Sequence, residues 1–206
     1  MCMNAIFGAN GYLTTLLERT GMMIKLNLIT ILFSLPVVTA GAAVTAMNYV
    51  SMKIDRGEEG YILKDFFRAF SLNLKQASSI WIFMLGWIII NLISVRMIGT
   101  SGLTFPKAGI CAWGVLNLTI TIVLVYAFAV LARFEEPNAM ILRHAFVLAF
   151  YHIPYTVAIM MALVLPVVFL SLFPQWFLLL FICGFSLPAM ISAHFFNRMF
   201  LKFERV

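Results

Sequence analysis

The densest group of residues that could do chemistry in this 206-residue sequence lies in one short stretch. The stretch from Asp55 to Arg68 carries charges of both signs, in a chain of which only 11% of the residues are charged. Mixed charge beside aromatic rings is typical of a surface that binds another protein, whereas attraction to anionic lipid needs basic residues alone. The sequence therefore predicts a partner-docking surface, with the candidate residues Glu58, Glu59, Lys64, Asp65, Phe66, Phe67, Arg68 and Phe70.

The same stretch also has the spacing of an amphipathic helix. Lys64, Arg68 and Lys75 fall on one helical face. The other face carries apolar residues, which are Leu63, Phe66, Phe67, Phe70 and Leu74. Such a helix can lie at a membrane interface with its aromatic side in the lipid. A plain anchor, in which the charges only neutralise one another, is therefore the alternative to a docking surface.

A second candidate site comes from the sequence FSLP, which occurs at residues 33–36 and again at 185–188. A proline inside a helix leaves a backbone carbonyl without its donor, and in lipid this carbonyl needs another partner. Transporters use such breaks, in corresponding halves, to line a polar binding site. The alternative is a simple kink that nearby groups satisfy. The candidate helix-break residues are Ser34, Pro36, Gly41, Ser186 and Pro188.

The remaining residues give no sign of catalysis, and we expect no enzyme activity, catalytic residue, metal or cofactor. The three histidines, His144, His152 and His194, lack the spacing of a metal site. The three cysteines, Cys2, Cys111 and Cys183, have no paired spacing and are expected to be free thiols. The apolar segments contain no Asp or Glu, which argues against a proton- or sodium-coupled carrier.

Composition indicates which elements position these residues. Hydrophobic residues make up 63% of the chain, against about 45–50% in soluble proteins. Most of this surface must therefore face lipid, and in lipid only helices satisfy the backbone of a chain without a barrel pattern. We expect an all-α, polytopic transmembrane bundle of about five apolar segments, the first broken at Pro36, with interfacial amphipathic helices. The net charge of +6 is expected to face an anionic membrane leaflet, with no role in nucleic-acid binding.

The charged residues divide this single membrane domain into segments. The first apolar segment, 26–52, is too long for one upright helix, so it is either a kinked, tilted span or a hairpin of two shorter helices. The excess of Lys and Arg places the 53–75 loop and the C-terminus in the cytoplasm under either interpretation. The expected divisions are an N-terminal interfacial segment (1–24), the broken segment (26–52), a charged loop with an amphipathic helix (53–75), membrane helices (76–95, 108–132, 146–170, 176–197) and a cytoplasmic tail (198–206).

Two stretches resemble a known family. "LPVVTAGAAVTAMNYVSMKIDRGEEGYILKDFFRAFSLNLKQA", residues 35–77, and "LPAMISAHFFNRMFLKFE", residues 187–204, resemble the YesL-like family of bacterial membrane proteins, which has no established activity. The resemblance implies the bacterial inner membrane and a role near carbohydrate import, because the family's genes often lie beside sugar-uptake genes. We therefore expect an accessory or regulatory component that associates with a sugar transporter complex. The alternative is a small-solute facilitator that acts as a homo-oligomer.

Overall fold

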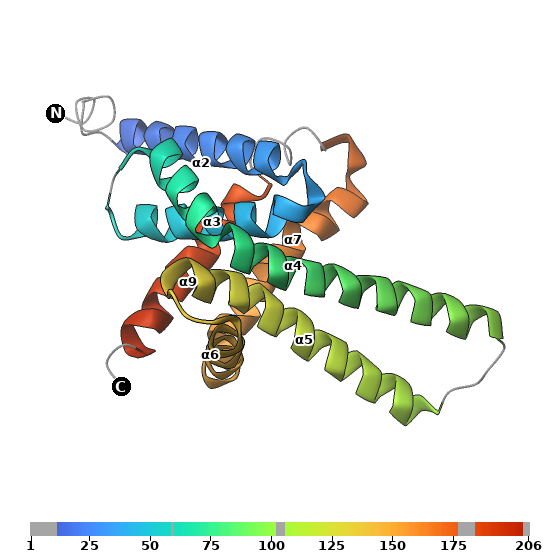
Figure 1. Cartoon of the computed structure of the whole chain (residues 1–206). Helices are drawn as coiled ribbons and strands as arrows, with labels where there is room; N and C mark the ends of the chain where they lie inside the picture. The colour runs from blue at the N-terminus through green and yellow to red at the C-terminus, as the bar shows by residue number, and fades with distance from the viewer. Residues whose placement is uncertain (1–11, 59, 102–105, 177–183, 204–206) are drawn as a thin grey trace.

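The computed structural model describes residues 12–58, 60–101, 106–176 and 184–203, and every regular element in these ranges is a helix (Figure 1). The α-helices are α2 (Tyr12–Ser34), α3 (Ala40–Asp55), α4 (Ile62–Ser101), α5 (Lys107–Arg133), α6 (Asn138–Tyr151), α7 (Ile153–Leu172) and α9 (Ser186–Phe203). Two short 3-10 helices, η1 (Val37–Thr39) and η2 (Pro174–Trp176), follow α2 and α7. The expected all-helical fold is confirmed for these residues.

The first apolar segment forms a hairpin. α2 ends at Ser34, and Pro36 is extended, with φ −73° and ψ 109°. The side chain of Thr39 donates a hydrogen bond to the carbonyl of Phe33 at 2.8 Å, which satisfies one of the acceptors that the end of α2 leaves free. α3 then runs back beside α2 (Figure 1), so the structure has the hairpin and not the single kinked span.

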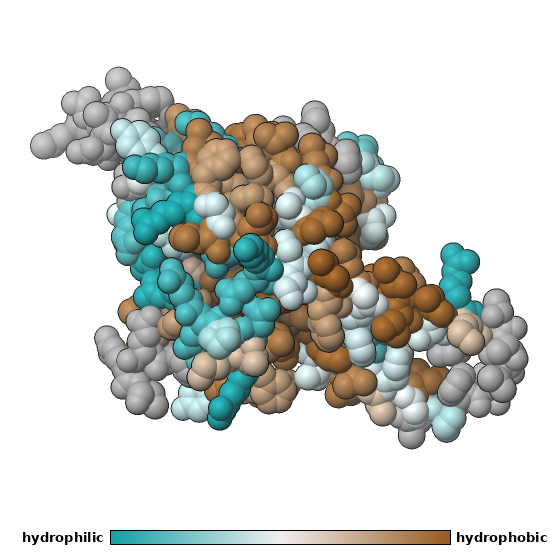
Figure 2. Space-filling model, viewed as in Figure 1, coloured by the Kyte–Doolittle hydropathy of each residue, from teal (hydrophilic) through white to brown (hydrophobic). Residues whose placement is uncertain are grey.

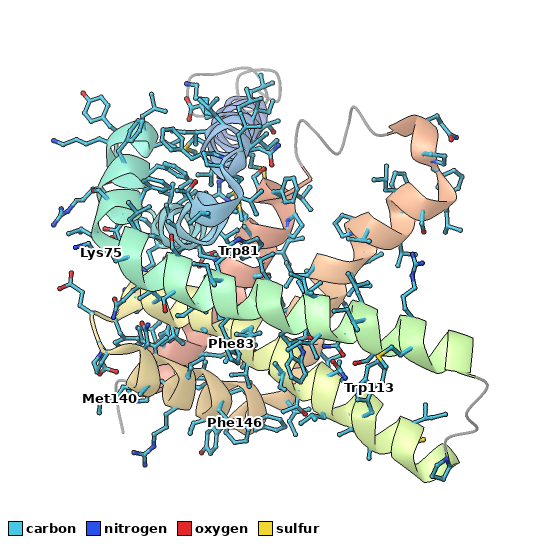
Figure 3. All side chains as sticks on the ribbon, turned by 45° about the vertical axis from the view of Figure 1, so that its right-hand side comes forward. Lys75, Trp81, Phe83, Trp113, Met140 and Phe146 are labelled. Atoms are coloured by element: carbon cyan, nitrogen blue, oxygen red, sulfur yellow. The ribbon has the colours of Figure 1, made fainter. Side chains whose placement is uncertain are left out.

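The amphipathic stretch is the beginning of a longer helix. α4 continues from Ile62 through the expected boundary at Lys75 to Ser101 and bends near Lys75, which Figure 3 labels. Phe66 is completely buried in its first part, where its ring lies 5.9 Å from that of Phe33 on α2. The apolar side of the amphipathic stretch therefore packs against the hairpin.

α3 lies at the centre of the bundle and packs against α2, α4, α5 and α9. It presents small buried residues, including Ala42, Ala43 and Ala46. A methyl group added at Gly41 would lie 2.6 Å from Trp81 Cβ and 2.7 Å from the carbonyl oxygen of Ala77, both on α4. Small residues of this kind let helix backbones approach closely in membrane proteins.

Three helices are long and apolar enough to cross a membrane, within the described residues: Ile62–Met97, Gly109–Arg133 and Ile153–Leu172. This supports a membrane protein, but the expected number of about five apolar segments is not confirmed. The expected span 146–170 is divided between α6 and α7, because the chain leaves helical geometry at His152. The expected span 176–197 corresponds only in part to α9, and residues 177–183 lie outside the described residues.

Polar residues gather at one end of the molecule. In Figure 2 the largest hydrophilic area lies on the left, and most of the remaining visible surface is apolar. The start of α2, the end of α3, the start of α4 and the end of α9 all lie towards this side in Figure 1. We call this region the polar end, and it contains the charged stretch that the sequence singled out.

Candidate functional site

A network of charged and amide side chains holds the connection between α3 and α4. The Nζ of Lys53, near the end of α3, lies 2.7 Å from Oδ2 of Asp65 in the first turn of α4. Gly60 allows this pairing, because a methyl group at its position would lie 2.5 Å from the same carboxylate oxygen. The hydrogen bond from Lys53 to Asp65 raises the pKa of the lysine, since it stabilises the protonated form.

Arg56 forms a second ion pair within the same connection. Its Nε donates to Oε1 of Glu58 at 2.7 Å, and its Nη2 donates to Oε2 at 3.2 Å. Gly57 lies between them with a φ of +69°, a conformation that glycine adopts without steric cost. The hydrogen bonds from Arg56 lower the pKa of Glu58, because they stabilise the carboxylate.

The same network reaches α9. Nδ1 of His194 lies 3.0 Å from Oδ1 of Asp55, and Nδ2 of Asn197 donates to Oδ2 of Asp55 at 2.8 Å. Asn197 also donates to the carbonyl of Met52 at 2.9 Å and accepts from Nη1 of Arg56 at 3.1 Å. Asn197 therefore joins the end of α3 to α9 through its whole amide group.

Sequence reasoning missed the part of His194 and Asn197 in this network. The two residues are three positions apart, which places them on the same face of a helix. The spacing could have indicated that His194 and Asn197 contact the same neighbouring element. Their partners on α3, however, are more than 130 positions away in the sequence, and no local pattern pairs them.

The structure divides the predicted docking residues into two groups. Lys64 and Arg68 are exposed, and Phe67 is 46% exposed. Asp65 and Glu58 are held in ion pairs, Phe70 is half-buried and Phe66 is buried. Phe66 therefore cannot supply apolar area to a partner, because it is part of the hairpin core. Glu59 lies outside the described residues.

The two helix breaks differ in structure. Ser34 and Pro36 lie at the hairpin turn, whereas α9 begins at Ser186 and places Pro188 in its first turn. The first backbone N–H groups of a helix have no partner within the helix, so Pro188 removes no helical hydrogen bond. Pro188 therefore starts a helix where the sequence suggested a break inside one.

A residue of α2 holds this start of α9. Oδ1 of Asn27 accepts hydrogen bonds from the backbone N–H groups of Phe185 at 3.0 Å and Ser186 at 3.1 Å. Asn27 is completely buried, and so is Ser186. The amide thus satisfies donors at the N-terminus of a helix that is remote in sequence, in the way that a capping side chain does locally.

Residues of the two FSLP sequences meet at one of two adjoining, partly open cavities. The hairpin cavity, of about 410 Å³, is lined by Ser34 and Leu35 from the first copy and by Phe185 from the second. The α3–α9 cavity, of about 290 Å³, lies between α3, α4, α5, α7 and α9 and includes Phe185 and Pro188. Both cavities share Val44, Met47, Trp81 and Phe185.

The lining of these cavities is mostly apolar and contains no charged side chain among the described residues. A polar transport site, which was one interpretation of the two breaks, would have more hydrogen-bonding groups in its lining. Among the residues that line the α3–α9 cavity, Asn48, Trp81 and Ser192 carry polar side-chain atoms, and those of Trp81 and Ser192 are buried. Ser34 and Leu35 of the first copy and Phe185 of the second therefore lie around a mostly apolar space.

No group of three or more His, Cys, Asp and Glu side chains that could hold a metal ion occurs in the described part of the chain. His144 lies beside Glu136, with Nδ1 to Oε2 at 2.9 Å, and His194 lies beside Asp55. Cys111 is a free, exposed thiol. Cys2 and Cys183 lie outside the described residues.

One family has a sequence profile that matches part of this chain. The family is described as a protein of unknown function, DUF624, and the match covers residues 23–95. These residues include α3, the second half of α2 and most of α4, and they contain the stretch 35–77 that resembles the YesL-like family. No curated protein and no solved structure matches the chain.

Proposed function

We propose that this protein is a non-enzymatic accessory or regulatory component of a membrane assembly for carbohydrate uptake. The observation that carries the proposal is the exposed basic face of α4, which consists of Lys64, Arg68 and Lys75. The exposed ring of Phe67 lies on the same part of the helix. Basic groups beside an exposed aromatic ring are typical of a site that binds an acidic protein surface.

The ion pairs explain why this face is basic. Asp65 is paired with Lys53, and Glu58 is paired with Arg56, so both acids are used within the protein. The buried side of the same segment packs on the hairpin through Phe66, which fixes the orientation of the exposed side. The association with carbohydrate uptake comes from the resemblance to the YesL-like family.

The alternative, a facilitator for small polar solutes, has less support. A sugar carries several hydroxyl groups, and each needs a hydrogen-bond partner when it leaves water. The α3–α9 cavity offers few such partners, because its lining is mostly apolar. Sugar flux into liposomes that contain only this protein would favour the facilitator over the accessory component.

Charge reversal on the basic face tests the docking surface. We expect the double variant Lys64→Glu and Arg68→Glu to lose co-purification with the membrane subunits of a sugar transporter in mild detergent. The control is Lys25→Glu with Arg143→Glu, which makes the same change in net charge at exposed positions on α2 and α6. Reversal of Glu58 would be less informative, because it also breaks the ion pair with Arg56.

The outcomes separate docking from anchoring. If the double variant inserts, folds and keeps the transporter subunits that the wild type binds, the basic face is not the docking surface. The plain anchor at the membrane interface would then be the better interpretation. If both double variants lose the subunits equally, the effect comes from net charge and not from this face.

A further inference from the structure

A small cavity beside the first part of α4 is lined by charged and polar side chains. It has a volume of about 110 Å³. Arg68 and Asn73 line it from α4, Tyr49 from α3 and Arg133 from the last residue of α5, and Glu135 follows the end of α5. The two larger cavities, by contrast, have no charged side chain among the described residues of their lining. We call this third cavity the arginine pocket.

Three helices bring these side chains to one place. Arg68 and Asn73 share one face of α4 with Leu72, which also lines the pocket, because residues four apart lie side by side on a helix. α3 packs against both α4 and α5, which brings its own lining residue to the same cavity. The chain leaves helical geometry after Arg133, at the extended residue Phe134. The pocket therefore lies where the end of α5 meets α3 and α4.

The wall of the arginine pocket suits an anion with several acceptor oxygens. Arg68 and Arg133 each carry a positive charge, and a guanidinium presents its N–H groups in a fork that matches phosphate oxygens. The phenol of Tyr49 and the amide of Asn73 can donate further hydrogen bonds. Two guanidinium groups and the single carboxylate of Glu135 leave an excess of positive charge. A phosphate group therefore fits this wall in both charge and hydrogen bonding.

Glu135 and the size of the pocket limit the ligand further. An ionised carboxylate only accepts hydrogen bonds, so it favours a hydroxyl group beside the phosphate. Pockets for drug-sized ligands measure about 300–1,000 Å³, so this one accommodates only the phosphate and its immediate neighbour. Leu72, which also lines the pocket, is 64% exposed. The rest of a ligand can therefore leave the pocket over an apolar surface.

We propose that the arginine pocket binds a phosphate ester that carries a hydroxyl group close to the phosphate. Arg68 and Arg133 bind the phosphate oxygens, and Glu135 accepts a hydrogen bond from the hydroxyl group. This chemistry occurs in a lipid headgroup, that of phosphatidylglycerol, and in a free solute such as glycerol 1-phosphate. The pocket shares Arg68 with the basic face of α4, but Tyr49, Asn73, Arg133 and Glu135 are not part of that face. The proposal therefore goes beyond the docking of a protein partner.

Lipid binding to the full-length protein in a neutral detergent tests the pocket. Native mass spectrometry measures the binding of phosphatidylglycerol and of phosphatidylcholine, whose headgroup has no net charge and no hydroxyl group. We expect phosphatidylglycerol to bind at least about tenfold more tightly. Competition by glycerol 1-phosphate then separates the two sources. If it displaces the lipid, the pocket also accepts a free solute, and if it does not, the ligand is the lipid headgroup.

Phosphatidylmethanol tests the hydroxyl group, because it has the same charge as phosphatidylglycerol and no hydroxyl in its headgroup. We expect the wild type to bind phosphatidylglycerol about fivefold more tightly than phosphatidylmethanol. In Glu135→Ala this ratio should fall to about one, because the acceptor for the hydroxyl is gone. Phosphatidylmethanol itself should bind at least as tightly to this variant, since the change removes a negative charge from the pocket.

Three variants test the donors. Arg68→Gln and Arg133→Gln each remove one guanidinium, and each is expected to weaken phosphatidylglycerol binding by about tenfold. Tyr49→Phe removes a neutral donor and is expected to weaken it by about threefold. The matched control is Arg143→Gln, because Arg143 is an exposed arginine on α6 that does not line the pocket. Arg68 is exposed, so Arg68→Gln is expected to fold normally and tests the pocket whatever Arg133→Gln does to folding.

Three results would overturn the proposal. Equal binding of phosphatidylglycerol and phosphatidylcholine to the wild type would show that the pocket does not select an anionic phosphate. Equal weakening by Arg68→Gln and the control Arg143→Gln would show that lipid is attracted by net charge alone. Equal binding of phosphatidylglycerol and phosphatidylmethanol to the wild type would show that the hydroxyl group has no part.

Lys64→Glu separates this inference from the proposed function. Lys64 belongs to the basic face of α4 but does not line the arginine pocket. We expect this variant to bind phosphatidylglycerol within about twofold of the wild type, whether or not it retains the transporter subunits. A loss as large as that in Arg68→Gln would contradict a separate pocket.

Discussion

At the scale of single residues, Gly41 sets the separation of α3 and α4. In Gly41→Ala the new methyl group would lie 2.6 Å from Trp81 Cβ and 2.7 Å from the Ala77 carbonyl oxygen, so one helix must move. We expect a loss of about 1–3 kcal/mol in the free energy of unfolding, measured by denaturation in detergent. The control is Gly86→Ala on α4, where nothing lies within 4 Å of the new methyl group. Equal effects of the two changes would contradict this account of α3–α4 packing.

Asn27 gives a second prediction at this scale. Asn27→Ala removes the acceptor for the backbone N–H groups of Phe185 and Ser186 at the start of α9. A buried donor without a partner costs about 1–3 kcal/mol, so the variant should unfold more readily and expose the start of α9 first. Hydrogen exchange at residues 185–189 would measure this. Asn117→Ala is the matched control, because that exposed amide bonds only to its own helix.

Residue types could be read from the sequence more easily than residue partners. The charges between Asp55 and Arg68 identified the network, but His194 and Asn197 were not connected with it. Phe66 and Phe67 are neighbours with the same side chain, and only the structure shows that one is buried and the other is half exposed. The α2–α3 hairpin makes this difference, because Phe66 belongs to the buried cluster between the hairpin and α4, whereas Phe67 contacts Phe33 but lies outside that cluster.

At the scale of elements, the connection between α3 and α4 should be sensitive to acid. The hydrogen bonds from Arg56 lower the pKa of Glu58 from its usual value of 4.5. A lowered pKa contributes stability that is present above the unfolded value and is lost as the pH falls through the folded value. Because Glu58 is 52% exposed at the side chain, we expect less than about 1 kcal/mol.

Glu58→Gln provides the comparison for this prediction. The wild type should be more stable than the variant at pH 6. The difference should shrink as the pH falls below 4.5 and vanish once the pH lies below the lowered pKa of Glu58. Thermal unfolding of both proteins across this pH range measures the difference. The difference should also shrink at high salt, because exposed charges are screened. A difference that does not change with pH would mean that the ion pair does not contribute.

The type of each element, an apolar helix, could be predicted from the sequence, but the residues at which the helices begin and end could not. Gaps between charged residues indicated apolar helices, yet Lys25 lies inside α2 and Lys75 inside α4, so charges do not end these helices. Both lysines are exposed, and a helix can carry such residues on its outer face without interruption. The break at His152 followed no charge and was missed.

At the scale of the whole molecule, the hairpin predicts a membrane topology. The beginning of α2 and the end of α3 lie towards the same end of the protein (Figure 1). Single cysteines at Glu18 and Tyr61, both exposed, should therefore react from the same side of the membrane. In a background without the natural cysteines, we expect an impermeant reagent to label neither in intact cells and both after permeabilisation. Labelling from opposite sides would indicate a single span and contradict the hairpin in the membrane.

Composition was sufficient to predict an all-helical, lipid-facing protein, because the fraction of apolar residues shows how much apolar surface must be kept from water by lipid or by other helices. It could not predict how many segments are true spans. α3 is rich in small residues and is buried by other helices, so its apolar character serves packing within the protein. The sequence does not distinguish a helix that is covered by neighbours from one that is covered by lipid.

The hydrogen bonds that join α9 to α2 and α3 can form only after the last part of the chain has been synthesised. Asn27 meets its partners at Phe185 and Ser186, 158 and 159 positions later, and Asp55 meets His194 139 positions later. At about 5–20 residues per second, a ribosome needs roughly 8–30 s to make the chain between Asn27 and Phe185. Through that interval the Asn27 amide and the Asp55 carboxylate lack their partners on α9. A nascent chain that stalls before α9 should therefore leave both groups without these partners. We expect quality-control proteases to degrade such a chain more readily than the complete protein.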